Sequence, residues 1–222
     1  MSTSAPPGNR FERRRAETRQ ALVRAARRIL AETGDTGTSI QAIAEQADVG
    51  FGSFYNHFDS KPALFEAAVV DALEEFGQAF DERLTGIDDP AELVAAGFRL
   101  SARMADSHPE LMQVLRRRGL GHIHAENGLT RRALRDVQVG MASGRFAVAD
   151  PTVALCALGG TLLSLVELRF ARPEVDGDEA AANLAEMTLR MLGVPPDDAH
   201  EVSRRPLPDL DRQRPAAAGS GN

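Results

Sequence analysis

The sequence of 222 residues lacks the usual marks of a disulfide-linked, secreted or membrane-spanning protein. It has one cysteine, Cys156, so no internal disulfide framework can form. The longest apolar run, residues 154–166, is shorter than the roughly 20 residues of a membrane span and contains two glycines. The N-terminus is polar and then basic, without the apolar stretch of a secretory signal. We therefore expect a soluble, cytoplasmic protein with no membrane partner.

Aromatic residues are also scarce and the chain is acidic overall, yet both aromatic and basic residues are enriched near the N-terminus. Aromatics make up 5% of the chain, with no tryptophan, yet the segment VGFGSFYNHFDSK at residues 49–61 holds three phenylalanines and the only tyrosine. The net charge of the whole chain is −6, whereas residues 1–61 carry nine basic against seven acidic side chains. Eight arginines fall within residues 10–28. A basic N-terminal region on an acidic chain favours a negatively charged partner there, although a solvated helix face has the same composition.

The spacing of apolar residues predicts an all-α fold with about nine helices. Leu22, Ala26, Ile29 and Leu30 form one apolar stripe of a first helix, and glycines follow it. Later helices are marked by capping residues, by prolines in their first turns and by glycines after their last turns. We find no alternating strand pattern and no internal repeat.

Two short predicted helices, joined by a turn at residues 48–50 and preceded by a longer helix, make a helix-turn-helix arrangement. The second helix of this motif enters the DNA major groove. Gly50 and Gly52 allow the backbone to approach DNA closely. Phe54 and Phe58 are four residues apart, so both can anchor the short helix while its other face remains free. The pattern predicts a DNA-binding domain over residues 13–60, after a disordered arm at 1–12.

The runs TRQALVRAARRILAETG and TSIQAIAEQADVGFGSFYNHFDSKPALFEA resemble the DNA-binding domain of the TetR/AcrR family of bacterial repressors. The resemblance covers about residues 18–68, and the rest of the chain matches only as a helical region of suitable length. It implies a homodimeric, ligand-responsive transcription regulator that is not an enzyme and has no cofactor. Residues 61–193 would then bind a small, largely apolar effector and dimerise, before a mostly flexible tail at 194–222.

The resemblance also implies roles for individual residues at the DNA interface. It places base contacts on Gln41, Phe51 and Gly52, and Asn56 at a position that can touch either the backbone or a base. Phe51 departs from the commoner family pattern, in which this position is polar or basic; it can pack on a thymine methyl or simply cover the domain surface. The positions expected to contact phosphates are Thr38, Ser39, Ser53, Tyr55, His57 and Lys61.

The effector pocket is expected among the helices that span residues 89–172. Its candidate lining residues are Phe98, Arg103, Met104, Met112, Leu115, His122, Met141, Glu167 and Phe170. The mostly apolar helix at 153–168 can be either a pocket wall or a dimer seam, and we favour the seam, because Gly159 and Gly160 permit close helix approach and the resemblance puts the last two long helices there. The candidate seam residues are Gly159, Gly160, Leu162, Leu165, Val166, Leu184, Met187 and Met191.

Other motifs carry weaker signals. The pair His122 and His124 lacks the further ligands of a four-coordinate metal site, so we expect no metal. The segment 50–54 is not a dinucleotide-binding loop, because no strand precedes it and the third glycine is missing. Three arginines at 116–118 fit a helix C-terminus, where the helix dipole favours cations. Two alternatives to a DNA-binding regulator stay open: a helical module that binds a ligand or a protein without DNA, and a helical-bundle enzyme.

Overall fold

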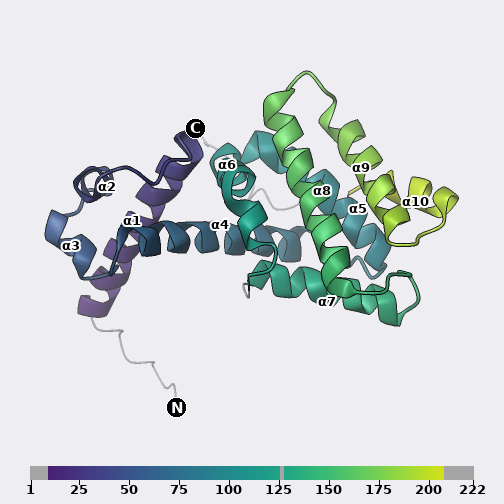
Figure 1. Cartoon of the computed structure of the whole chain (residues 1–222), viewed down its shortest axis with the longest axis horizontal. Helices are drawn as coiled ribbons and strands as arrows, with labels where there is room; N and C mark the ends of the chain where they lie inside the picture. The colour runs from purple at the N-terminus through teal and green to yellow at the C-terminus, as the bar shows by residue number, and fades with distance from the viewer. Residues whose placement is uncertain (1–9, 126–127, 208–222) are drawn as a thin grey trace, which may run out of the picture.

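The computed structural model describes residues 10–125 and 128–207 of the chain (Figure 1). Within these residues there are ten α-helices, one short 3-10 helix and no strand, so the predicted all-α fold is confirmed with one helix more than expected. The helices are α1 (Arg10–Glu32), α2 (Ile40–Gln46), α3 (Phe51–Tyr55), α4 (Lys61–Arg83), α5 (Pro90–Ser107), α6 (Pro109–Arg118), the 3-10 helix η1 (Gly119–His122), α7 (Gly128–Ala142), α8 (Pro151–Ala171), α9 (Gly177–Met191) and α10 (Pro196–Ser203).

Helices α1, α2 and α3 form a small unit at one end of the molecule, which we call the head (Figure 1). Gly34, with φ of +70°, ends α1 in a left-handed conformation that suits glycine. The Ser39 side chain accepts a hydrogen bond from Ala42 N and so caps α2. Asp48 adopts φ of +53° in the turn between α2 and α3, which aspartate tolerates better than most side chains. The sequence thus fixes both the start of α2 and the sharp turn into α3.

Helix α4 joins the head to the rest of the molecule. The Ser60 side chain caps its N-terminus and proline follows in its first turn, both as the sequence predicts. Its first turns pack against α1, and farther along it packs against α6 and α7. Figure 1 shows it running without a break from the head into the helices beyond. One continuous helix, which begins just after the predicted domain boundary at residue 60, therefore links the head to the helices beyond it.

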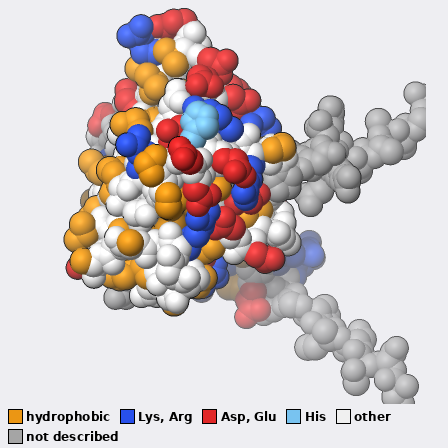
Figure 2. Space-filling view, turned by 90° about the vertical axis from the view of Figure 1, so that its right-hand side faces the viewer, with side chains coloured by type: hydrophobic (Ala, Val, Ile, Leu, Met, Phe, Trp, Pro, Cys, Tyr) orange, Lys and Arg blue, Asp and Glu red, His pale blue; other side chains and the backbone are white. Residues whose placement is uncertain are grey.

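Helices α5 to α10, which we call the body, form their own apolar core. Helix α5 packs against α8, α9 and α10, and α9 packs against α8 and α10. Phe98, Leu165 and Leu189 are fully buried among these helices. The body end farthest from the head shows interleaved acidic and basic side chains (Figure 2). This end therefore resembles an ordinary solvated surface rather than a patch of one charge sign.

The expectation of a mostly flexible tail from residue 194 is wrong for its first part. Helix α10 lies within it, and Val194, Ala199 and Val202 are buried against the body core. Arg145 holds α10 through an ion pair with Asp198. The sequence signal for α10 is weak, since an eight-residue helix between prolines resembles a turn region. The remaining tail, residues 208–222, and residues 1–9 of the predicted disordered arm lie outside the described residues, while 10–12 are helical rather than disordered.

Helix α8 extends on both sides beyond the apolar run at residues 154–166. It spans 21 residues and has a window of mean hydropathy 1.7, so by length and composition alone it is apolar enough to cross a membrane. Only 22% of that window is buried in the single chain. Length alone therefore does not exclude a membrane span, and a single helix of this kind is weak evidence for one. Helix α8 packs against α5, α7 and α9, and the rest of its apolar surface is exposed in the single chain.

Candidate nucleic-acid interface and ligand cavity

The recognition helix α3 is held in the head by two aromatic side chains. Phe54 is fully buried and Phe58 is nearly so, with their ring centroids 6.1 Å apart. The Arg19 guanidinium of α1 lies over the Phe58 ring, 5.1 Å from its centroid. The predicted anchoring of a short, glycine-bearing helix by these two rings is confirmed. Because the anchors occupy one face, the other face of α3 stays exposed.

The outer face of α3 combines two aromatic rings with open backbone. Phe51 and Tyr55 are 52% and 57% exposed, and their rings meet edge to face with centroids 5.8 Å apart. A Cβ added at Gly52 would meet no atom within 4 Å, so the backbone there is open to a partner. Each of the ten predicted DNA-contacting residues is exposed or half-buried, and they gather at the start of α2, along α3 and just after it, and at the start of α4.

Three of these residues, Ser39, Gln41 and Lys61, already make side-chain hydrogen bonds within the molecule. Gln41 donates from its amide to the Glu45 carboxylate over 3.1 Å, which fixes its direction on α2. Lys61 donates from Nζ to the carbonyl of Gly37 over 3.0 Å. That bond ties the start of α4 to the loop before α2, a role that sequence reasoning missed. Lys61 thus orders the edge of the surface as well as supplying a positive charge to it.

Arginines of α1 extend the positive surface beyond the recognition helix. Arg14 and Arg15 border a shallow depression together with Ser53, Asn56 and His57. Burial, followed by the charges of Arg15 and Arg19, lowers the pKa of His57 below its usual value. A neutral imidazole there can accept or donate a hydrogen bond without adding charge. The head therefore presents hydrogen-bonding groups and arginines at one surface, which suits a phosphate backbone beside base edges.

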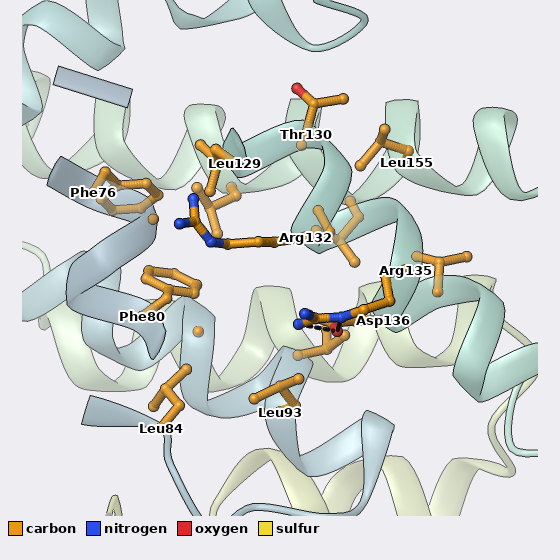
Figure 3. Close-up of a pocket in the computed structure, with 18 of the residues that line it drawn as sticks. Phe76, Phe80, Leu84, Leu93, Leu129, Thr130, Arg132, Arg135, Asp136 and Leu155 are labelled. Atoms are coloured by element: carbon orange, nitrogen blue, oxygen red, sulfur yellow. Dashed lines mark hydrogen bonds and ion pairs between the residues drawn. The ribbon is translucent and has the colours of Figure 1, made fainter. Parts of the chain in front are cut away.

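The body contains a cavity of about 450 Å³ between α4, α5, α7 and α8 (Figure 3). Most of its wall is apolar. The aromatic side chains Phe76 and Phe80 come from α4, and leucines come from the other helices. The principal apolar lining residues are Phe76, Phe80, Leu93, Leu129, Leu155 and Leu162. A space of this size and character fits a small, largely apolar molecule.

Polar groups in the cavity wall are concentrated on α7. Arg132 pairs with two carboxylates of α4: its Nη2 lies 2.8 Å from Glu74 Oε1, and its Nε lies 2.7 Å from Asp81 Oδ2. Arg135 pairs with the neighbouring Asp136 over 2.9 Å. Figure 3 shows the Arg132 side chain reaching from α7 towards Phe76 and Phe80. A ligand would thus meet both hydrogen-bond donors and carboxylate acceptors on one side of an apolar space.

Two of the carboxylates near the arginines of α7, Glu74 and Asp136, have pKa values shifted in opposite directions. The hydrogen bond from Arg132 holds the pKa of Glu74 below the usual glutamate range. Burial raises the pKa of Asp136, and this outweighs the opposing hydrogen bond from Arg135. The Asp136 carboxylate is therefore incompletely solvated and incompletely compensated. A ligand hydroxyl that donates to it would replace part of the lost solvation.

Three of the nine predicted pocket residues, Phe98, Leu115 and His122, lie on the cavity wall. The other six are not among the lining residues, so their assignment is wrong. Met104 and Met112 are buried in the core between head and body, and Met141 packs on the body core. Arg103 pairs with Asp178, Glu167 pairs with Arg116, and Phe170 lies beneath the Arg116 guanidinium. These residues occupy the correct helices but the wrong faces.

The predicted dimer seam is divided in a similar way. Gly159, Leu162 and Val166 line the cavity, and Leu165 is fully buried within the protomer. These four residues face the interior, so their assignment to the seam is wrong. A Cβ added at Gly160 would meet nothing within 4 Å, and Leu184 is half-buried on α9. Met187 and Met191 are 59% and 55% exposed. Of the predicted seam residues, Gly160, Leu184, Met187 and Met191 therefore remain available at the surface of α8 and α9.

The two histidines of the His122-x-His124 motif diverge. His122 Nε2 lies 3.0 Å from a Glu66 carboxylate oxygen, whereas His124 Nε2 lies 3.2 Å from the Cys156 sulfur. The second contact joins residues that are distant in sequence and was not anticipated. Within the described part of the chain, no group of three or more histidine, cysteine or acidic side chains could hold a metal ion.

A helix-turn-helix head on a continuous helix that borders a cavity in a helical body defines a class of DNA-binding regulators with a ligand-binding domain. Family models agree with this class. Residues 22–68 match the model "Bacterial regulatory proteins, tetR family", and residues 89–205 match "Tetracyclin repressor-like, C-terminal domain". The chain belongs to the TetR family of bacterial regulatory proteins. The members of this family are transcriptional regulators.

Individual relatives add detail. A crystal structure of RolR in complex with resorcinol is 31% identical to this chain, and the match covers 90% of this chain and 99% of RolR with a TM-score of 0.63. The regulator UidR of Escherichia coli (strain K12) is 36% identical over 70 residues, which is 32% of this chain and 36% of UidR. The repressor DhaR of Mycobacterium sp. (strain GP1) is 45% identical over 50 residues, 22% of this chain and 25% of DhaR. The chain therefore spans about a third or less of the length of these two curated relatives.

Proposed function

We propose that this protein is a cytoplasmic repressor that binds a pseudo-palindromic operator as a homodimer and leaves it when a small effector enters the cavity. The observation that carries the proposal is the position of α4. One end of α4 packs with α1 in the head, and its other half supplies Phe76 and Phe80 to the cavity wall. A molecule that enters the cavity must therefore contact the helix on which the head is mounted.

The effector is a small aromatic compound with hydroxyl groups. The apolar walls favour a ring, and Phe76 and Phe80 can pack against it. Hydroxyl groups can donate to Asp136 or Asp81 and accept from the arginines of α7. Resorcinol, the ligand of the related RolR structure, has this chemistry. The same polar groups would disfavour a purely hydrocarbon effector, because their hydrogen bonds to water would be lost without replacement.

The outward face of α8 and α9 is the surface for a second copy. Val153, Met187 and Met191 are each more than half exposed, and Gly160 leaves room for a facing helix. Large exposed apolar side chains on neighbouring helices are typical of subunit interfaces. A twofold dimer also fits the head, since paired recognition helices read half-sites about 34–36 Å apart on one face of DNA. This pairing would cover the apolar surface of α8 that a single chain leaves exposed.

Release follows from geometry and linkage. A tilt of α4 changes the separation of the two heads in the dimer, so it changes their fit to successive major grooves. An effector that prefers the tilted state needs only a few kcal/mol of differential affinity to depopulate the DNA-competent state. By reciprocity, operator DNA weakens effector binding by the same factor.

A selection from random duplex DNA followed by band-shift titration tests the proposal. We expect the purified protein to enrich a pseudo-palindromic sequence and resorcinol to weaken its binding to that duplex. Gly52→Leu should abolish binding, because the added side chain blocks the backbone approach to DNA. Gly121→Leu is the matched control, since a Cβ at either glycine meets nothing within 4 Å.

Failure to enrich any sequence would overturn the regulator and favour a helical module that binds ligands or proteins without DNA. Enrichment without any effect of resorcinol would retain the DNA-binding regulator and reject this effector class. A reporter gene placed behind the selected sequence separates repression from activation. Higher expression when the regulator is deleted is the expected result, and lower expression would contradict repression.

A further inference from the structure

The cavity wall and the attachment of α4 to the body share the same side chains. Arg132 and His122 both line the cavity, and both pair with carboxylates on α4. His122 Nε2 is 3.0 Å from Glu66 Oε1 near the start of α4. Arg132 reaches Glu74 and Asp81 farther along the same helix. Polar groups that a ligand would meet are therefore already engaged in holding α4.

Residues of both α4 and α7 leave room for the contact between Arg132 and α4. Glu74 and Asp81 are seven residues apart, so two helical turns place them on one face, where a single guanidinium bridges both. A Cβ at Gly77 of α4 would lie 2.7 Å from Arg132 Nη1, and a Cβ at Gly128 would lie 2.8 Å from the same atom. Glycines on both sides thus leave space for the guanidinium between α4 and α7.

The ion pairs of Arg132 with Glu74 and Asp81, which we call the clamp, are only partly shielded from water. A ligand can therefore compete with the two carboxylates for the guanidinium. The Arg132 side chain is 24% exposed, and those of Glu74 and Asp81 are 40% and 50% exposed. Pairs of this kind contribute little net free energy, so a modest new interaction can replace them. The side chain already passes along the cavity wall (Figure 3), so it reaches a ligand by a change of rotamer.

We propose that Arg132 is the residue that couples the cavity to the head. In the DNA-competent state its guanidinium clamps α4 through Glu74 and Asp81. A hydroxyl or other acceptor of the effector draws the guanidinium into the cavity, which releases α4 and lets the head tilt. This inference rests on the proposed function, because it assumes that the effector and the operator favour different positions of α4.

Glu74 offers a clean test, since it is part of the clamp but not of the cavity wall. Its replacement weakens the clamp without removing a group that touches the effector. Linkage then predicts two opposite changes: weaker operator binding and tighter effector binding by a similar factor. A purely structural role for Glu74 would lower thermal stability without this reciprocal pair of changes.

The experiment compares Glu74→Gln with Glu82→Gln in the full-length protein. Glu82 is an exposed α4 residue whose side chain makes no hydrogen bond or ion pair with the described residues, so both variants remove one negative charge from the same helix. The probes are the duplex that the wild-type protein selects, followed by band shift, and resorcinol, followed by calorimetry. Relative to Glu82→Gln, we expect Glu74→Gln to bind the duplex about fivefold more weakly and resorcinol about fivefold more tightly.

Charge alone predicts the opposite change in operator binding, because loss of a negative charge near DNA strengthens the complex. Equal behaviour of the two variants in both titrations would therefore overturn the clamp. Arg132→Gln should also weaken operator binding, but without the gain in resorcinol affinity, because it removes the effector contact as well. Retained tight operator binding by Arg132→Gln would contradict the proposal.

The outcome is separable from failure of the proposed function. A wild-type protein that selects no duplex removes both the function and this inference. If the wild-type protein binds its duplex but not resorcinol, the effector class is wrong. Weaker operator binding by Glu74→Gln than by Glu82→Gln would still support the clamp in that case, and equal binding would reject it.

Discussion

The head side and the cavity side of α4 are held by different kinds of contact. On the head side, the Arg27 side chain of α1 is 11% exposed and pairs with Asp71 over 2.8 Å and with Glu75 over 2.6 Å. On the cavity side, the Arg132 side chain is 24% exposed and pairs with Glu74 and Asp81 beside a cavity. A largely buried guanidinium resists displacement, whereas a more exposed one beside open space yields more readily. The head should therefore move as one body with α4, and the adjustable joint should lie at the cavity.

The largest expected difference between the two regions is in their response to salt. Raising the salt concentration from about 50 to 200 mM should weaken operator binding by roughly 10³-fold if about six phosphates are neutralised across a dimer. Resorcinol binding in the cavity should change far less, because it neutralises no phosphates. Band shift and calorimetry at matched salt concentrations measure the two effects. A salt-insensitive operator complex would show that the arginines of the head do not contact the DNA backbone.

Replacing an aromatic ring by alanine compares the packing of the head with the packing of the cavity wall. Phe54→Ala removes a fully buried ring of the head and should lower the free energy of unfolding by about 3–5 kcal/mol. Phe80→Ala should cost less than half as much, since Phe80 is half-buried and already borders the cavity. Urea unfolding curves of the two variants give the comparison. Equal losses would mean that the cavity wall is packed as rigidly as the head.

Arginine replacement tests the difference between the two ion pairs directly. Arg27→Met should lower the free energy of unfolding by about 2 kcal/mol, because it leaves the carboxylates of Asp71 and Glu75 partly buried without their partner. Arg132→Met should lower it by less than about 1 kcal/mol, since the Arg132 side chain is 24% exposed, against 11% for Arg27. Thermal or urea unfolding would measure both. A larger loss for Arg132→Met would place the rigid joint in the body.

Two head variants should separate positioning from base readout. Lys61→Ala should weaken binding similarly on all sequences, since it removes a positive charge and the bond to the Gly37 carbonyl. Gln41→Ala should cost about 1–3 kcal/mol at one base position and relax preference there. Binding measured on a panel of single-base operator variants distinguishes them. Uniform losses for both variants would contradict a readout role for Gln41.

The smallest expected effect concerns the distal end of the body in acid. Hydrogen bonding by Arg145 lowers the pKa of Asp198. Burial raises the pKa of Asp89, but the hydrogen bonds from Arg145 and Ala91 N and the charges of Arg145 and Arg205 together outweigh it, so that pKa is also lowered. A lowered pKa in the folded state stabilises it above the ordinary aspartate value of about 3.9, and this stabilisation is lost as pH falls further. Wild-type protein should therefore lose more stability than Arg145→Leu between neutral pH and about pH 3. Parallel pH profiles of urea midpoints would refute this contribution.

The head could be predicted almost to the residue because its constraints are local. Phe54 and Phe58 are four residues apart, so their shared face follows from helix geometry alone. The capping role of Ser39 and the turn at 48–50 likewise depend on neighbours in sequence. Each of these features survives in the structure with its expected role in the fold. Short-range geometry thus determines which face of α3 remains available.

The body resisted prediction because its assignments depend on long-range contacts. Helix α8 is apolar on nearly all sides, so its pattern identifies no single face for a seam or a pocket, and Leu162 and Val166 were assigned to the wrong one. The pairing of Arg132 with Glu74 joins residues 58 apart in sequence, and each of them alone resembles an ordinary solvated charge. Helix positions could be predicted here, whereas the interior partners of individual side chains could not.

Helix α10 has a practical consequence for shortened versions of the protein. A chain ended after Met191, where the long helices finish, would lose the buried side chains of Val194, Ala199 and Val202 and expose the apolar surface that they cover. Arg145 would also lose its contact with Asp198. A chain ended after Leu207 would keep all of these contacts. Crystallisation or binding work that trims the C-terminus should therefore cut beyond residue 207 to avoid aggregation of the recombinant product.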